Sequence, residues 1–121
     1  MATGYVENQH ALLPITFIQP NSPHLSLEFV VDTGFTGFLT LPSEAVRALQ
    51  LPYLEDIAAN LADDTNVALA VHVATIQWNG VQRDVRVLAT GRRPLLGTAL
   101  LTGHELVIQF VEGGLVSIGQ L

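Results

Sequence analysis

The sequence predicts an all-β domain, a small closed β structure with one or two short helices. Most apolar stretches alternate with polar residues at a period of two, as half-buried strands do, and turn-forming residues separate them. Only two short segments have the features of helices, and a parallel βαβ fold would need more and longer ones. We therefore expect about seven or eight strands.

The first expected hairpin ends at an aspartate. An apolar run from Leu12 to Gln19 and a segment from Leu25 to Val31 are separated by Pro20-Asn21-Ser22-Pro23, which favours a turn. One face of the second segment carries only apolar side chains, namely Leu25, Leu27, Phe29 and Val31. Asp32 follows directly, so this strand delivers a single carboxylate into a tight turn.

Two further hairpins are expected in the second half of the chain. The stretch from Val67 to Leu88 is broken by Asn79-Gly80, which suits a type I′ turn because both central residues need positive φ. The last hairpin runs from Leu106 to Ile118 and turns at Glu112-Gly113-Gly114.

Helix is expected only in short pieces. Pro42 to Leu49 reads as two turns, with Pro and Ser suited to the start and Glu44 in the first turn. Leu51-Pro52 ends this helix. Another short turn of helix is expected at Ala99-Leu100-Leu101, before Gly103.

The composition bounds the domain organisation. At 121 residues, the chain has the length of a single domain spanning residues 1–121. With 49% apolar and 13% charged residues, disorder is not expected. The absence of cysteine excludes a disulfide framework and a thiolate metal site.

The net charge and the lengths of the apolar runs limit which classes of partner the chain can bind. The net charge is −6 and lysine is absent, so nothing supplies the broad positive face that nucleic-acid binding needs. Residues 1–20 lack the basic start of a signal peptide, and no stretch approaches the roughly 18 to 20 apolar residues of a membrane span. We expect a cytoplasmic protein with no nucleic-acid or membrane partner.

Two motifs carry the functional hypothesis. Asp32-Thr33-Gly34 follows an apolar strand, and Leu95-Leu96-Gly97 comes far downstream, before a short helix. This pairing resembles the retropepsin-like aspartic proteases, most closely the small single-domain bacterial aspartyl proteases, over most of the chain from about Leu12 to Ile118. The resemblance implies a small closed β-barrel of the acid-protease type and an aspartic endopeptidase activity.

The chemistry of such an enzyme requires a second carboxylate. Peptide hydrolysis by carboxylates takes two that share one proton, one activating water and the other donating to the carbonyl oxygen. The chain contains one Asp-Thr-Gly, so we expect Asp32 of a second copy to supply the partner across a two-fold axis. The prediction is a homodimer that acts on a peptide or protein substrate without a cofactor.

The resemblance assigns roles to named residues. Asp32, Thr33 and Gly34 form the catalytic group, with the Thr33 hydroxyl bonding across the dimer. The expected substrate-binding residues come from the same loop, from a flap-like hairpin and from the downstream motif: Phe35, Thr36, Gly37, Asp63, Asp64, Thr65, Leu96 and Gly97. Gly97 lets the downstream segment pack behind the catalytic loop.

Three features depart from the family pattern. Phe35 stands where many members have Ala or Ser, and its ring either lines the substrate pocket or packs under the loop. Thr36 and Thr98 replace an Asp–Arg pair that supports the dimer in retroviral members, so this dimer must be held in another way. The flap segment Leu61–Asn66 is polar and acidic instead of glycine-rich.

Other interpretations stay open. Asp32 also suits an Asx turn, with its carboxylate accepting nearby backbone N–H groups. A catalytically silent dimeric β-barrel module that binds a protein or peptide is the alternative function, and the chain also fits a domain of a larger protein. The four histidines, His10, His24, His72 and His104, fall in different elements, so no metal site is expected.

Overall fold

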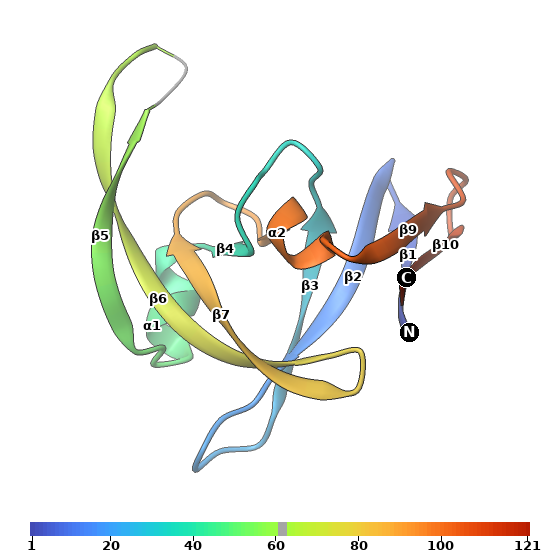
Figure 1. Cartoon of the computed structure of the whole chain (residues 1–121), viewed down its shortest axis with the longest axis horizontal. Helices are drawn as coiled ribbons and strands as arrows, with labels where there is room; N and C mark the ends of the chain where they lie inside the picture. The colour runs from blue at the N-terminus through green and yellow to red at the C-terminus, as the bar shows by residue number, and fades with distance from the viewer. Residues whose placement is uncertain (61–62) are drawn as a thin grey trace.

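The structure is a computed structural model that describes residues 1–60 and 63–121 (Figure 1). It is an all-β fold with two short helices, α1 (Ser43–Ala48) and α2 (Thr98–Leu101). The strands are β1 (Ala2–Glu7), β2 (His10–Phe17), β3 (Leu25–Val31), β4 (Leu39–Leu41), β5 (Tyr53–Asn60), β6 (Asn66–Trp78), β7 (Val81–Ala89), β8 (Leu95–Leu96), β9 (His104–Ile108) and β10 (Leu115–Gln120).

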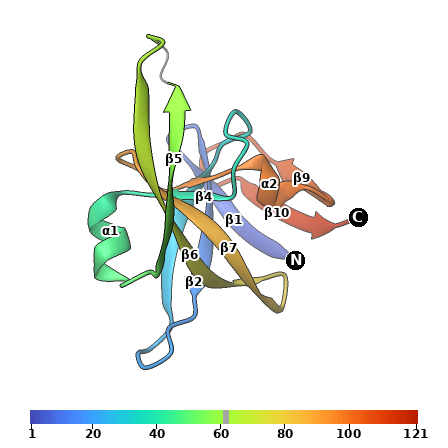
Figure 2. The same ribbon diagram turned by 60° about the vertical axis from the view of Figure 1, so that its left-hand side comes forward.

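All described strands belong to one mixed sheet. Its order is β5-β6-β7-β4-β8-β3-β2-β1-β10-β9. Most neighbours are antiparallel, whereas β3 with β8 and β4 with β7 are parallel. An additional pairing of Phe17 with Ile76 joins β2 to β6. The sheet coils strongly, and the β5–β6 hairpin projects from one end of the molecule (Figures 1 and 2).

The three expected hairpins are confirmed. Residues of β2 and β3 pair in antiparallel register, with Leu13 opposite Phe29. The β6–β7 turn has φ of 49° at Asn79 and 85° at Gly80, the positive values that a type I′ turn requires. The last hairpin pairs β9 with β10 as expected, although β9 ends at Ile108.

The sequence pattern did not indicate β1 and β5. Almost every side chain of β5 is exposed, so no apolar period of two marks this strand. The two short strands β4 and β8 are also additional, which gives ten strands in the described residues against the expected seven or eight. Both expected helices are present, and α1 buries Val46 against the core.

One hydrophobic core fills the coiled sheet. Phe17 and Phe29 are almost fully buried and stack with their ring centroids 5.9 Å apart. Aliphatic side chains from both halves of the chain surround them, and those that are fully inaccessible are Leu13, Leu39, Leu41, Ile76, Val87, Leu96, Leu100, Val116 and Ile118. Among the described residues, no helix is long and apolar enough to cross a membrane.

Candidate functional site

Asp32 stands at the end of β3, where the sheet fixes its backbone. Its N–H donates to the carbonyl of Leu96 at 2.9 Å, and its carbonyl accepts the N–H of Phe35 at 3.2 Å. Its carboxylate Oδ1 accepts the N–H of Gly34 at 2.9 Å. The side chain is half-buried, whereas Thr33 and Gly34 are exposed. One carboxylate oxygen is therefore oriented by the turn, at a position that solvent can reach.

The downstream motif holds this loop from behind. Gly97 N–H donates to the carbonyl of Phe38 at 2.8 Å, and Thr98 N–H donates to the carbonyl of Phe35 at 2.8 Å. Ala99 N–H reaches the carbonyl of Gly37 at 3.2 Å. These bonds run between two segments that are far apart in sequence. They limit the motion of the loop because its carbonyls are satisfied by a second backbone.

Two glycines make room for the aromatic ring of Phe35. A Cβ placed on Gly97 would lie 2.2 Å from the carbonyl oxygen of Gly37 and 2.5 Å from Cδ2 of Phe35. A Cβ on Gly37 would lie 2.5 Å from Cζ of the same ring. The ring thus packs against its own loop and the downstream glycine. This contact favours packing under the loop for Phe35, and its contact with substrate stays a prediction.

Short strands place the two motifs side by side. Val31 of β3 pairs with Leu96 of β8, and Leu39 of β4 pairs with Leu96 from the other side. The buried hydroxyl of Thr40 accepts the N–H of Leu95 at 3.2 Å. Leu96 is fully buried between β3 and β4, so among the expected substrate-binding residues its side chain belongs to the core.

The expected flap residues that the structure describes belong to the β5–β6 hairpin. Asp63, Asp64 and Thr65 are exposed and lie between β5 and β6, at the end of a hairpin that projects from one end of the molecule (Figures 1 and 2). Asp63 Oδ1 accepts the N–H of Thr65 at 3.0 Å. Side-chain and backbone hydrogen bonds from Thr65 lower the pKa of Asp63. The flap residues Leu61 and Ala62 lie outside the described residues.

A hollow of about 250 Å³ opens beside the loop that carries Asp32. Thr36, Gly37 and Phe38 of this loop line it together with residues from β4, β5, β6, β7 and α2, namely Leu39, Glu55, Ile57, Val71, Arg86, Leu88 and Ala99. Arg83 places its guanidinium carbon 5.3 Å from the ring centroid of Phe38. The lining is mostly apolar, with one acidic and one basic side chain, so it suits an apolar side chain of a bound peptide.

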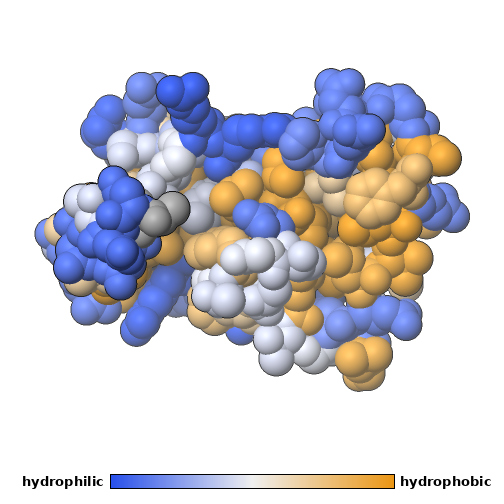
Figure 3. All heavy atoms as spheres, turned by 90° about the horizontal axis from the view of Figure 1, so that it is seen from above, coloured by the Kyte–Doolittle hydropathy of each residue, from blue (hydrophilic) through white to orange (hydrophobic). Residues whose placement is uncertain are grey.

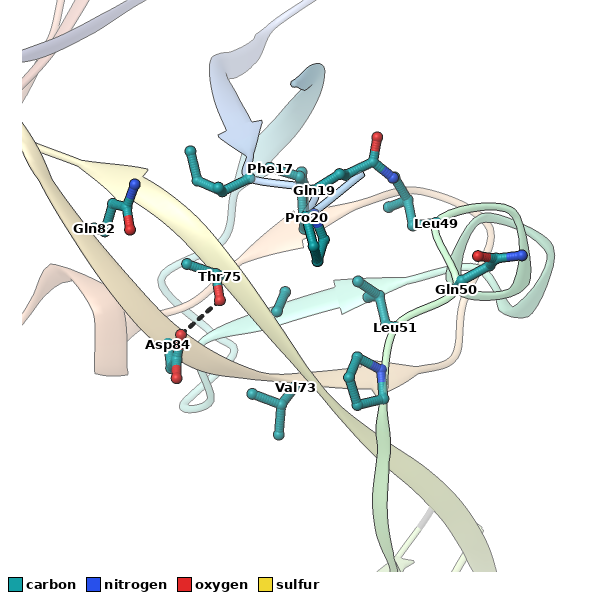
Figure 4. Close-up of a pocket in the computed structure, with 13 residues that line it drawn as sticks. Phe17, Gln19, Pro20, Leu49, Gln50, Leu51, Val73, Thr75, Gln82 and Asp84 are labelled. Atoms are coloured by element: carbon teal, nitrogen blue, oxygen red, sulfur yellow. Dashed lines mark hydrogen bonds between the residues drawn. The ribbon is translucent and has the colours of Figure 1, made fainter. Parts of the chain in front are cut away.

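A larger hollow of about 550 Å³ lies elsewhere in the fold and contains none of the expected site residues (Figure 4). It lies between Phe17 and Leu51, where β6 stops pairing with β5 and begins to pair with the end of β2. Thr75 donates its hydroxyl to Asp84 at 2.6 Å on one wall. Size alone does not select the chemical site, because this hollow holds no carboxylate in a rigid turn.

His72 and His104 each lie within hydrogen-bond distance of a backbone carbonyl. His72 Nδ1 lies 2.9 Å from the carbonyl of Leu51, and His104 Nδ1 lies 2.9 Å from the carbonyl of Thr102. Trp78 donates its indole N–H to His104 Nε2 at 3.2 Å. Within residues 1–60 and 63–121, no three His, Asp or Glu side chains gather closely enough to hold a metal ion.

Several residues of the hollow were not identified from the sequence. Glu55 and Ile57 belong to β5, a strand without a sequence pattern, and Ala99 lies on α2 directly behind the loop. Thr40, which supports Leu95 and does not line the hollow, was missed because a buried threonine in a short strand gives no sequence signal. The alternation of β7 places Arg86 and Leu88 together, which was the only usable signal.

Comparison of the chain with protein-family models, with curated proteins and with solved structures gave no match. The resemblance to retropepsin-like proteases therefore depends on the two sequence motifs and stays a prediction.

Proposed function

We propose that this protein is an aspartic endopeptidase that works as a homodimer, with Asp32 of each copy forming one catalytic pair. The observation that carries the proposal is the loop itself: a half-buried carboxylate ends β3, and Leu96, Gly97 and Thr98 hold its loop through backbone hydrogen bonds. A general base for water needs this fixed position more than it needs a large pocket.

The catalytic step requires two such carboxylates in contact. One, ionised, takes a proton from water as the oxygen attacks the peptide carbonyl, and the other, protonated, donates to the carbonyl oxygen. Collapse of the tetrahedral intermediate breaks the C–N bond, and the nitrogen leaves with a proton from the pair. Two other carboxylates are engaged by hydroxyl groups, since Asp84 accepts a hydrogen bond from Thr75 and Asp56 accepts one from Tyr53, and Glu55 lines the hollow beside the loop. A second copy of Asp32 is the partner that this chemistry needs.

The strand pairings support a closed barrel of the retropepsin type. Following the hydrogen-bonded neighbours from β6 through β7, β4, β8, β3 and β2 returns to β6 through the pairing of Phe17 with Ile76. In such a barrel, the loop after β3 opens at one end, and the β5–β6 hairpin takes the place of a flap. A peptide would enter the hollow that Ile57, Val71 and Ala99 line.

A cleavage assay tests the proposal. The purified chain is incubated with a broad peptide library between pH 3 and pH 8, and products are identified by mass spectrometry. We expect cleavage below neutral pH that Asp32→Asn abolishes. Asp84→Asn is the matched control. This exposed carboxylate accepts a hydrogen bond from Thr75 in the larger hollow, so its replacement should leave cleavage unchanged.

The same assay judges the silent binding module. That alternative expects no peptide to be cut by a confirmed dimer, and expects Asp32→Asn to leave both fold and partner binding intact. The packing of Phe35 against Gly37 and Gly97 favours the enzyme, since this ring position does not require the ring to fill the hollow.

A further inference from the structure

We propose that the second copy docks on the edge strand β9 and the tip of the β9–β10 hairpin, a surface we call the hairpin face. It consists of Val107, Phe110, Val111 and Leu115. This inference rests on the proposed function, because that function needs a second copy and does not say where it binds.

The first argument is the open edge of β9. In the sheet of the described residues, β9 is the terminal strand, with β10 on one side only. Gln109 N–H donates to the carbonyl of Leu115, so by alternation the backbone groups of Val107 also point toward β10. The N–H and C=O groups of Leu106 and Ile108 then point toward the open edge. Such an edge is a template for another strand.

The second argument is exposed apolar surface. Phe110 and Val111 are each 66% exposed, Leu115 is 47% exposed and Val107 is 46% exposed. Seen from above, hydrophobic surface is concentrated on the half of the molecule opposite the β5–β6 hairpin (Figure 3). Apolar side chains this exposed on one hairpin are expected at an interaction site.

The third argument selects a copy of the same chain as the occupant. An antiparallel pair of β9 strands centred on Val107 sets Leu106 of one copy opposite Ile108 of the other, and these are the residues whose backbone groups face the open edge. Glu105 then lies opposite Gln109, so no two carboxylates meet. The stretch 106–111 carries no charge in a chain of net charge −6, which lets two acidic copies approach.

The fourth argument is continuity with the candidate site. Leu96 accepts the N–H of Asp32, and α2 leads from the next residues toward β9. This helix has four residues and is therefore about 6 Å long. For both proposals to hold, the two-fold axis that relates the two β9 strands must also bring the two copies of Asp32 together.

The decisive test is a single cysteine. The natural chain has none, so Val107→Cys introduces one thiol. The register places the two copies of residue 107 in a non-hydrogen-bonded pair, with Cα atoms about 4.5 Å apart, a separation that a disulfide can span. We expect mild oxidation to give a covalent dimer. Val81→Cys, on the exposed β6–β7 hairpin, is the control and should stay monomeric on a denaturing gel. Equal cross-linking of both variants would refute the register.

A second variant measures the affinity. Val111→Asp places a charge on the hairpin face, and Val81→Asp places the same charge at a site of similar exposure, 62% against 66%. Because the face occurs twice in the dimer, we expect Val111→Asp to raise the dimer Kd at least 100-fold by sedimentation equilibrium, with Val81→Asp within threefold of the natural chain. An unchanged Kd for Val111→Asp, or a natural chain that stays monomeric, would overturn the proposal.

The two proposals fail in different ways. If the natural chain cuts peptides and Val111→Asp dimerises normally, the protease proposal stands and the proposal of the hairpin face as dimer interface is refuted. A chain that cross-links through Val107→Cys and cuts no peptide keeps the hairpin face and refutes the protease. Circular dichroism of each variant confirms that the fold is retained.

Discussion

Gly97→Ala tests whether the two motifs form one packed unit. The backbone of Gly97 has φ −104° and ψ 177°, an extended conformation that alanine adopts without strain. The cost of the methyl group therefore comes from contact alone. Its Cβ would lie 2.2 Å from the carbonyl oxygen of Gly37, where ordinary contact is 3.4–4 Å, and 2.5 Å from Cδ2 of Phe35.

The magnitude follows from what has to move. Relieving the oxygen contact needs a shift of about 1 Å, and the Gly37 carbonyl also accepts the N–H of Ala99. Weakening that bond costs about 1–3 kcal/mol, and displacing the Phe35 ring costs a similar amount. We expect Gly97→Ala to lower the free energy of unfolding by about 3 kcal/mol, measured by urea denaturation.

Two comparisons sharpen this test. Gly119→Ala is the control, because its Cβ would meet only Met1 Cε at 3.4 Å, and it should change the free energy of unfolding by less than about 0.5 kcal/mol. The double variant Phe35→Ala/Gly97→Ala should lose less free energy of unfolding than the sum of the two single variants, because the contact between the new methyl group and the Phe35 ring is then absent. A Gly97→Ala chain as stable as the Gly119→Ala chain would refute the packing argument.

Two pH-dependent predictions concern hydrogen-bonded side chains. A hydrogen bond to Glu28 raises the pKa of Tyr5 to about 12, so its stabilising effect is complete below the ordinary tyrosine pKa and is lost as pH rises through about 12. Glu28→Gln should lower that pKa, seen as earlier phenolate absorbance; an unchanged titration would contradict it. Hydrogen bonds from Thr65 lower the pKa of Asp63, so their effect is present above the ordinary aspartate pKa and is lost as pH falls through the lowered value. Thr65→Ala should raise the Asp63 pKa in a carboxyl NMR titration, and no shift would show that the backbone bond alone sets it.

The predictable part of the fold consists of strands that bury one face. The β6–β7 hairpin could be read from its alternation and from Asn79-Gly80, because both signals are local. In contrast, β5 is held by backbone pairing with β6 while most of its side chains stay exposed. Its sequence therefore lacks the apolar alternation that would predict a strand. The pairing of β3 with β8 was equally invisible, since two residues of Leu show no period.

The candidate site divides in the same way. Asp32 and Gly97 could be identified from two short sequence motifs. In the structure, the two segments are in contact through the carbonyl group and the ring of Phe35. The packing of the Phe35 ring against Gly37 and Gly97 depends on segments that are distant in sequence, so no local sequence pattern predicts it. The flap tip could be placed at a turn, but its distance from Asp32 depends on how β5 and β6 coil (Figure 2).

The hydrogen bond from Gly34 to Asp32 changes how the two interpretations of this carboxylate relate. An Asx turn and a catalytic aspartate were alternatives in the sequence, yet both require this bond, because it orients one carboxylate oxygen. The turn is therefore no argument against catalysis. What separates the interpretations is the group that meets the other oxygen: water alone for a structural turn, and a second Asp32 for the enzyme. If both proposals hold, one two-fold axis relates the two hairpin faces and the two copies of Asp32, so locking the dimer through Val107→Cys should preserve cleavage. Loss of cleavage in the locked dimer would show that this axis does not bring the two carboxylates together.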